Sequence, residues 1–388
     1  MNSNNVSIFA QILQLFPKKD FFKEVEKTGA EFKTKGFSSW DQFVSMLFCQ
    51  IGKANSLREI CGGLASSAGK LNHLGMAEAP SKSTLAHANK NRPWELFEGV
   101  FYQLLEKCEQ LTAKTKRKFK FKNPLFSIDG SIIDLCLSMY DWAKYRTAKG
   151  AIKLHMVLDH DGYLPTFLNV TEGKVHEINV ARTLRFPKDS IIAMDRGYID
   201  YLFFANLNDA GVFFVTREKS NAKYLVVEER VIPKIGNIRK DQLIKLEGYY
   251  SKEKYPHLLR RIEVWIEEKQ QTITLLTNHL NFGPTTIASI YKERWQIETF
   301  FKAIKQNLKI KTFVGTSKNA LLTQIWTAFI AILVLKYLKM LSQFEWSLSN
   351  LVAMLRFNLL VYKDLWVWLN NPYQPPPEPD IKQLYLAF

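Results

Sequence analysis

Residues 125–137 read LFSIDGSIIDLCL, and this stretch decides the fold. Its apolar residues, three of which are β-branched isoleucines, are typical of a β-strand. An acid, Asp129, comes late in its first apolar run and is followed by Gly130 and Ser131, so the carboxylate can emerge at a strand edge. Such an acid is either a turn residue or a ligand for a cation, because a buried carboxylate is costly unless it is paired.

The residues after this strand alternate between strand-like and helical patterns. The strand-like segments are IKLHMVLD (152–159), YLPTFLNV (163–170), SIIAMD (190–195) and VFFVTRE (212–218), with a hairpin turn at 160–162 and a helical stretch at 198–211. An antiparallel meander followed by strand, helix and strand predicts an α/β fold, in which a mixed sheet has helices on its faces.

A β-rich insertion is expected at about residues 218–282, because strand-like segments follow one another there without a strong helical pattern between them. These segments are VVEERVI (226–232), IRKDQLIKL (238–246), RRIEVWIEE (260–268) and TITLLTN (272–278). Helices resume at about Thr286 and continue to about 370. The tail from Pro372 to Pro377 is expected to be extended, because proline is incompatible with a helix interior.

The N-terminal region is predicted to be all-helical. Ser39 and Gln42 fit a capping box, a second helix begins near Ser56, and residues 80–84 (PSKST) introduce a short basic helix. A helix, a turn and a basic helix fit a DNA-docking unit, and an ordinary helical bundle fits equally well. The boundaries expected are a helical domain at 1–112, a sheet-containing core with its insertion at 113–340, and a C-terminal helical segment with the proline-rich tail at 341–388.

Composition indicates a polyanionic partner. The 388 residues carry 53 Lys and Arg against 37 Asp and Glu, a net charge of +16, and binding to phosphates releases counterions. Six of the nine residues 114–122 (KTKRKFKFK) are basic, and this run is either solvated or contacts phosphates. The four cysteines form no C-x-x-C pair, which fits a reducing cytosol. The most apolar run, 328–335, is too short to span a bilayer and is expected to be a buried helix.

Two further acids complete the pattern that begins at Asp129. Asp195 ends the apolar run 190–194, and Glu298 lies in the helical segment SIYKERWQIETFFKAIKQNLK (289–309). At about 100° per residue, Glu298 falls on a stripe roughly 60° wide. That stripe also holds Tyr291, Arg294 and Lys305, with Lys302 and Lys309 beside it.

This arrangement suits phosphodiester chemistry. Three carboxylates can hold two divalent ions roughly 3.5–4 Å apart, which activate the attacking oxygen and stabilise the leaving one. Carboxylate oxygens suit Mg²⁺ or Mn²⁺. The cationic stripe would then bind phosphates and stabilise charge in the transition state.

The residues Tyr291-x2-Arg294-x3-Glu298-x6-Lys305 resemble the Y-R-E-K signature of the insertion-sequence-four group of DDE transposases. SIDGS around Asp129 and MDRGYID around Asp195 resemble the first and second acidic motifs of that family. The resemblance covers about residues 124–340, and the helical N-terminus resembles the DNA-binding region that precedes such cores.

The resemblance implies an RNase H-like core with a β-rich insertion between the last two acids. It implies a catalytic triad of Asp129, Asp195 and Glu298, and a cut-and-paste transposase that joins transposon ends to target DNA, with hairpin intermediates expected. The expected partners are the terminal inverted repeats, target DNA and a second copy of the chain, in the bacterial cytoplasm at the nucleoid and away from membranes. Tyr291, Arg294 and Lys305 would contact phosphates near the transposon end.

Several roles have alternatives. Trp265 in the insertion is a candidate for stacking on a flipped base, and an inward-facing core residue is the alternative. Lys153, His155 and Arg217 either line the cleft or are structural. Two other functions fit the same motifs, namely an RNase H-like nuclease or resolvase and a catalytically inactive DNA-binding protein derived from a transposase.

Overall fold

The computed structural model describes residues 6–34, 36–67, 69–113, 117–136, 138–146 and 149–373. Most of the predicted proline-rich stretch lies outside the described residues. Contacts between residues divide the chain into two compact units, of which one contains Met1–Leu104 with Trp326–Phe388 and the other Leu105–Ile325. The C-terminal segment, which the sequence suggested as a third part, groups with the N-terminal helices.

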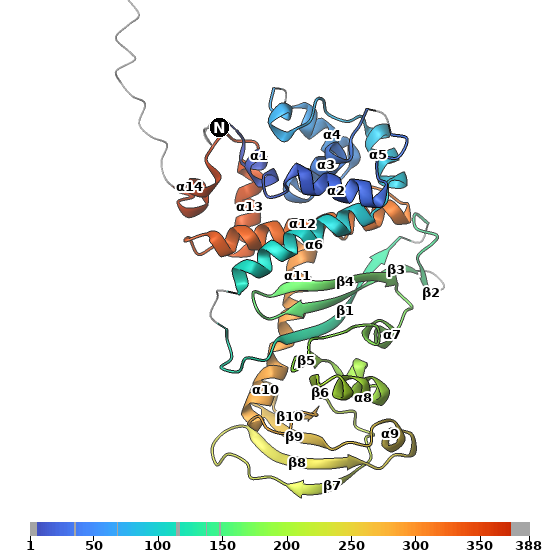
Figure 1. The fold of residues 1–388 in the computed structure, drawn as a ribbon, viewed down its shortest axis with the longest axis vertical. Coiled ribbons are helices and arrows are strands. Elements are labelled where there is room, and N and C mark those ends of the chain that lie inside the picture. The colour runs from blue at the N-terminus through green and yellow to red at the C-terminus, as the bar shows by residue number, and fades with distance from the viewer. Residues whose placement is uncertain are drawn as a thin grey trace, which may run out of the picture. The chain divides into compact units, whose positions relative to one another are not determined.

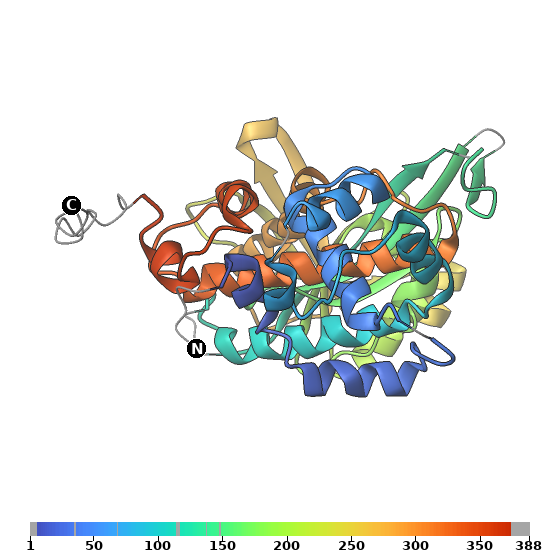
Figure 2. The same cartoon turned by 90° about the horizontal axis from the view of Figure 1, so that it is seen from above.

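The first unit is helical. Its helices are α1 (Ile8–Leu13), α2 (Lys18–Thr28), α3 (Ser39–Gly52), α4 (Leu57–Ala65), the 3-10 turn η2 (Leu71–Leu74), α5 (Lys82–Asn91), α13 (Leu348–Asn358) and α14 (Leu365–Asn370), with parts of α6 (Glu95–Thr112) and α12 (Lys318–Leu341). The Gln11 side chain joins the two ends of the chain, because its amide donates to Lys363 O at 2.6 Å and accepts from Leu365 N at 2.8 Å. Figure 2 shows α13 and α14 in red beside α1 in dark blue.

The capping box of α3 lies one residue before the predicted one. Ser38 Oγ accepts from Asp41 N, and the Asp41 carboxylate accepts from Ser38 N at 2.9 Å. Gln42 is fully buried and donates to Asn89 Oδ1 instead. The prediction of Ser39 and Gln42 was wrong because an aspartate three residues after a serine caps as well as a glutamine does.

Helix α12 contains the predicted apolar run and is longer than that run. It has 24 residues and is long and apolar enough to cross a membrane, and 89% of its most apolar window is buried inside the protein. That degree of burial is typical of the core helix of a globular protein. The expectation of a buried helix is therefore confirmed.

The second unit is built on one mixed sheet of ten strands (Figure 1). The strands are β1 (Leu125–Leu135), β2 (Lys144–Arg146), β3 (Lys149–Asp159), β4 (Leu164–Glu172), β5 (Ile191–Met194), β6 (Phe213–Arg217), β7 (Tyr224–Glu229), β8 (Ile238–Leu246), β9 (Leu259–Ile266) and β10 (Gln271–Thr277). Strands β1, β3 and β4 form the predicted antiparallel meander, and β1, β5 and β6 are parallel neighbours. This order of strands is that of an RNase H-like sheet, as expected.

Both faces of the sheet are covered by apolar side chains. On one face Ile192 and Met194 pack with α8 (Tyr201–Asp209), and α7 (Glu177–Ala181) contributes Ala181 to the same cluster. On the other face Ile191 and Ala193 pack with α10 (Pro284–Glu293). Strand β5 is buried along its whole length, which explains why its sequence is a continuous apolar run rather than an alternation.

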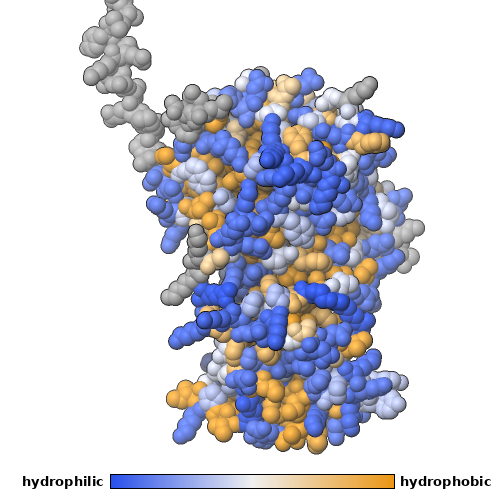
Figure 3. All heavy atoms as spheres, viewed as in Figure 1, coloured by the Kyte–Doolittle hydropathy of each residue, from blue (hydrophilic) through white to orange (hydrophobic). Residues whose placement is uncertain are grey.

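The predicted insertion extends the sheet. Strand β10 pairs with β6, and β9, β8 and β7 follow in that order. A short helix, α9 (Tyr249–Lys254), and a 3-10 turn, η4 (Glu267–Lys269), lie between the strands, so the expectation of strands alone was incomplete. Strand β7 is an edge strand with exposed apolar side chains such as Leu225 and Val227. Hydrophobic side chains gather at the β7–β9 end of the face in Figure 3.

Candidate active site

Two of the three predicted acids lie where two parallel strands end side by side. Strands β1 and β5 pair as far as Ile128 and Met194 and then part. Asp129 comes next on β1, and its Oδ1 accepts from Gly130 N at 2.8 Å. Asp195 comes next after β5, and its Oδ1 accepts from Gly197 N at 2.7 Å at the start of the 3-10 turn η3 (Arg196–Tyr198). Buried strands therefore bring both carboxylates to one edge.

The third acid lies on a helix that is not continuous with the preceding one. Helix α10 ends at Glu293 and α11 (Trp295–Asn307) follows after Arg294. Arg294 N donates to Tyr291 O, and Ile297 N donates to Arg294 O, each at 3.2 Å. Hydrogen bonds three residues apart are those of a tighter 3-10 turn. The single helix predicted for 289–309 is therefore interrupted at Arg294 by one tighter turn, and it ends at Asn307.

Arg294 joins the acid on the helix to the acid on the strand. Its Nη2 donates to Glu298 Oε1 at 2.7 Å, and its Nη1 lies 3.9 Å from Asp129 Oδ2. The Arg294 side chain is only 12% exposed, and its Nε is buried without a hydrogen-bond partner. A guanidinium between two carboxylates offsets the charge that burial would otherwise make costly.

The electrostatics of Asp129 indicate that the three acids share one region. Burial raises the pKa of Asp129 to about 7, against the Gly130 amide and the Arg294 guanidinium, which lower it. The charges of Asp195 and Glu298 both raise the same pKa. Crowded carboxylates of this kind favour a bound cation, because each additional positive charge relieves their mutual repulsion.

Carboxylate oxygens are the ligands that Mg²⁺ and Mn²⁺ prefer, so the chemistry of these donors fits a divalent ion. Within the described part of the chain, no three His, Cys, Asp or Glu side chains are gathered closely enough to hold an ion as they stand. Arg294 lies between Asp129 and Glu298, and a cation bound by both would need this guanidinium to move.

Cations surround an open pocket of about 450 Å³ between β1 and α11. It is lined by Asp129 and Glu298 and by three lysines, namely Lys302, Lys305 and Lys311. Lys305 Nζ donates to Ser131 Oγ at 2.7 Å and to Ile132 O at 2.9 Å, so this lysine is held against the strand that carries Asp129.

Lys309 does not lie on the helical stripe. Helix α11 ends at Asn307, and the Lys309 carbonyl accepts from the Gln324 side chain at 2.7 Å. Its predicted place on the stripe is wrong because the helix ends before this residue, whereas its role in binding DNA stays a prediction. Lys311, which sequence reasoning missed, lines the pocket from beyond the helix, where no periodic pattern could have identified it.

The other predicted residues lie at different places. Tyr291 is near Asp195 and Arg217, whose charges both affect its pKa, although burial is the largest cause and raises it. Trp265 is half-buried on β9, and the Arg239 guanidinium lies 5.8 Å from its ring centre. Trp295, at the start of α11, is more exposed, at 57%.

Glu293, which sequence reasoning also missed, fixes the junction between α10 and α11. Its carboxylate accepts hydrogen bonds from Lys118 and from Tyr163 at 3.2 Å, and His160 Nδ1 lies 3.9 Å away. The contact with His160 and the Lys118 ammonium lower the pKa of Glu293 to about 2, against the effect of burial. Because 3.9 Å is long for a hydrogen bond, Lys118 carries more of this stabilisation. Lys118 of the basic run is therefore engaged within the protein.

Glu293→Gln is expected to lower the free energy of unfolding by about 2 kcal/mol at pH 7, because the folded state favours the ionised carboxylate. A depressed folded-state pKa gives stability that is complete above the unfolded value near 4.5 and is lost as pH falls towards 2. Urea unfolding of both proteins should therefore converge as the pH is lowered through this window. The exposed Glu267→Gln is the control, and equal unfolding midpoints for Glu293→Gln and wild type at pH 7 would contradict the assignment.

A sheet of this order, with acids at the ends of two parallel strands and a third on a helix after an insertion, defines the RNase H-like class of phosphoryl-transfer proteins. Residues 120–334 match the family model described as the transposase DDE domain. The chain therefore belongs to the DDE transposase family, and it is a DNA transposase, an enzyme that cleaves DNA and transfers strands. This family generally uses divalent metal ions. Family membership therefore favours a transposase over the alternative of an RNase H-like nuclease or resolvase.

Relatives agree with this assignment. The chain is 33% identical over 314 residues to y4zB of Sinorhizobium fredii, which is described as a transposase. The aligned residues make up 79% of this chain and 84% of the relative. It is also 25% identical over 258 residues to a Geobacillus stearothermophilus protein described as a transposase for insertion sequence element IS5377. Here the aligned residues make up 66% of this chain and 67% of the relative. The resemblance to the insertion-sequence-four group agrees with a third relative, a Synechocystis protein described as a transposase for insertion sequence element IS4SA, which is 23% identical over 265 residues that make up 66% of this chain and 71% of the relative. Residues 4–77 match a domain of unknown function, DUF4372.

One solved structure is weakly similar over most of the chain. The piggyBac transposase synaptic complex with hairpin DNA, determined by cryo-EM, aligns with 98% of this chain and 84% of that chain. The TM-score is 0.43 and the identity is 12%, which is too low a likeness to support an argument about function.

Proposed function

We propose that this transposase moves DNA by a cut-and-paste reaction in which Asp129, Asp195 and Glu298 are the catalytic carboxylates. The observation that carries the proposal is the position of Arg294, which contacts both Asp129 and Glu298 at the edge where Asp195 also lies. A single buried cation in contact with acids from a strand and a distant helix supports one shared site.

The three carboxylates are proposed to hold two Mg²⁺ or Mn²⁺ ions. When bound, such ions activate the attacking oxygen and stabilise the leaving oxygen of a phosphodiester. The protein's own part is to hold the carboxylates at the strand ends and to exclude competing ligands. Arg294 is proposed to exchange Glu298 for a DNA phosphate, because guanidinium groups bind phosphates with two parallel hydrogen bonds.

The remaining cations are proposed to bind the DNA backbone. Lys305 is already held against β1 by Ser131 and Ile132 O, which supports a fixed role beside Asp129. Lys302, which is exposed in the same pocket, supports a second phosphate contact, and Tyr291 and Lys309 are kept as further candidates. Trp265 is proposed as a base-stacking residue, supported by its position on the insertion and by its partial exposure.

The helical N-terminal region is proposed to bind the terminal inverted repeats. Ser81 Oγ caps α5 by accepting from Thr84 N, and this helix carries the basic residues predicted from the sequence. Two DNA ends must be joined, so a homodimer on DNA is proposed as the active assembly, in the cytoplasm at the bacterial nucleoid. The net charge of +16 supports a nucleic-acid partner.

The test is cleavage of DNA that carries the ends of the element. The full-length protein, with Mg²⁺, should cut a duplex bearing the terminal inverted repeat and leave a duplex with the same repeat shuffled intact. It should then join the released 3′ ends to a target plasmid. Binding of the repeat without cleavage in Mg²⁺ or Mn²⁺ would overturn the proposal and favour a catalytically inactive derivative.

A further inference from the structure

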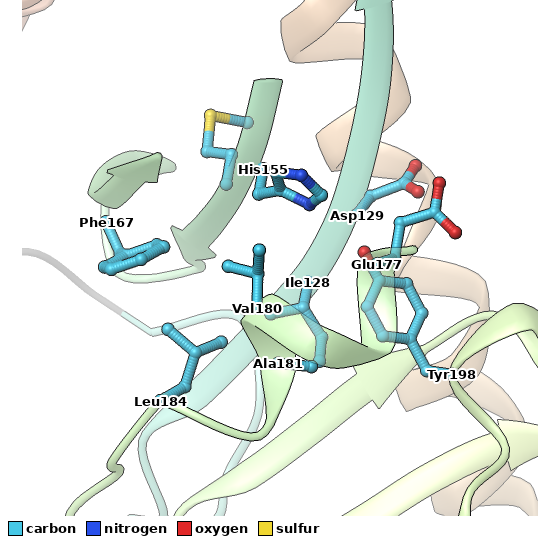
Figure 4. Close-up of a pocket in the computed structure, with 10 residues that line it drawn as sticks. Ile128, Asp129, His155, Phe167, Glu177, Val180, Ala181, Leu184 and Tyr198 are labelled. Carbon is cyan, nitrogen blue, oxygen red and sulfur yellow. The ribbon is translucent and has the colours of Figure 1, made fainter. Parts of the chain in front are cut away.

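A fourth carboxylate, Glu177, lies beside the proposed catalytic Asp129. Glu177 is the first residue of α7, and it lines the same small cavity as Asp129, His155 and Tyr198. Figure 4 shows the Glu177 and Asp129 carboxylates side by side on one side of β1, with the Tyr198 ring next to Glu177. No resemblance or motif assigns a role to this residue.

A buried lysine holds Glu177 at this place. Lys153 Nζ lies 3.1 Å from Glu177 Oε1 and donates to Val175 O at 2.9 Å. The Lys153 side chain is 10% exposed and that of Glu177 is 34% exposed. Burial of an ammonium is costly unless it is paired, so the ion pair fixes the Glu177 side chain, which remains partly exposed to solvent.

The backbone next to Asp129 is shaped for Glu177. A Cβ atom on Gly130 would lie 3.0 Å from Glu177 Cγ and 3.2 Å from Glu177 Oε1. Both distances are tighter than ordinary contacts, so an alanine at 130 would require the Glu177 side chain to shift by a few tenths of an ångström. A glycine at 130 therefore accommodates the close approach of Glu177 without this shift.

An unpaired nitrogen also lines this cavity. His155 is 3% exposed, and its Nδ1 has no hydrogen-bond partner. Its Nε2 lies 2.9 Å from Thr171 Oγ1, whose own hydroxyl donates to Glu172 O at 3.1 Å. Nε2 therefore carries the proton, and Nδ1 presents a lone pair. The cavity of about 10 Å³ is lined by His155, Asp129 and Glu177 together with apolar side chains, and it has room for roughly one water.

We propose that Glu177 is a positioning residue of the metal centre, where it binds the water shell of the divalent cation held at Asp129. Lys153 holds its side chain in place, and the absence of a side chain at Gly130 leaves room for it. The inference rests on the proposed function of Asp129 as a metal ligand. Partners of this kind orient the ligands and typically raise metal affinity 10–100-fold. Glu177 touches the bound cation through water and takes no part in breaking or forming bonds.

The experiment measures Mn²⁺ binding to the full-length protein without DNA, by titration calorimetry. Glu177→Gln is expected to weaken Mn²⁺ binding 10–100-fold, and Gly130→Ala, which shifts Glu177 by a few tenths of an ångström, is expected to weaken it by less. Combining the two changes should add little. The control is Glu172→Gln, since Glu172 pairs with exposed Lys174 and should bind Mn²⁺ as wild type does. The thermal unfolding midpoint of each variant without metal separates a binding defect from misfolding.

End cleavage gives a second readout. The activity of Glu177→Gln should recover as the Mn²⁺ concentration is raised, because only its affinity is reduced, whereas Asp129→Asn should stay inactive. Wild-type Mn²⁺ affinity in Glu177→Gln, with affinity lost in Asp129→Asn, overturns the role of Glu177 and leaves the proposed metal centre intact. Unchanged affinity in both variants overturns both proposals.

Discussion

Glu298→Gln is expected to reduce the rate of DNA end cleavage by roughly 10³-fold or more while leaving affinity for the DNA end within a few-fold of wild type. The glutamine oxygen can still accept the 2.7 Å hydrogen bond that Arg294 Nη2 gives Glu298. The variant should therefore keep α11 in place and lose only the negative charge. A neutral amide of the same shape binds a divalent cation much more weakly than a carboxylate does, because it lacks the negative charge.

Single-turnover cleavage of a labelled end duplex measures the first effect, and a gel-shift titration without divalent ions measures the second. Glu268→Gln, on the exposed turn η4, is the matched control and should cleave at the wild-type rate. If Glu298→Gln cleaved DNA within tenfold of the wild-type rate, Glu298 would not be the third catalytic acid. The proposal of one active site built from β1, β5 and α11 would then be wrong.

The strands that carry Asp129 and Asp195 could be predicted because burial leaves a clear pattern. Strand β5 is apolar at every position, and its end is marked by an acid and a glycine nearby. The hairpin between β3 and β4 was marked by its turn residues, and Gly162 has the positive φ of 82° that such a turn requires. Local sequence therefore sufficed wherever one segment determined its own structure.

The break at Arg294 could not be predicted, because neither proline nor glycine marks it. Tyr291, Arg294 and Glu298 keep helical spacing on either side, so the pattern alone favours one helix. Glu293 shows the cause: its carboxylate is bound by Lys118 and Tyr163 from distant parts of the chain. These contacts fix the end of α10, and the sequence around Glu293 alone cannot predict them because both partners are distant in the chain.

The position of Glu177 escaped prediction for the same reason. Its partner Lys153 is on β3 and its neighbour Gly130 is on β1, so only the register of the sheet brings the three together. Lys153 and His155 were candidates for lining the cleft. In the structure His155 lines the cavity, and Lys153 forms an ion pair with Glu177, which lines the same cavity. The sequence therefore indicated Lys153 and His155 as candidates but could not show that Lys153 pairs with Glu177.

A buried ion pair connects the insertion to the helix that carries Tyr291. Arg260 on β9 donates to both carboxylate oxygens of Asp241 on β8, at 2.8 and 2.7 Å. Both side chains are 2% exposed. Arg260 also donates to the carbonyl of Phe282, just before α10 begins. The guanidinium therefore joins two strands of the insertion to the segment that leads into the active-site helices.

Asp241→Ala is expected to lower the free energy of unfolding by about 3–5 kcal/mol, because it leaves the Arg260 charge buried without a partner. Urea unfolding measures the loss, and Asp209→Ala, at a side chain 69% exposed, should change stability by less than about 0.5 kcal/mol. Replacing both partners by apolar residues, Asp241→Leu with Arg260→Met, should recover much of the loss, because no charge is then left unpaired. A double variant as unstable as Asp241→Ala would instead indicate that the hydrogen bonds of Arg260 to the segment before α10 are the main contribution. End cleavage by the double variant would then fall as well, because Tyr291 and Arg294 depend on that segment for their position.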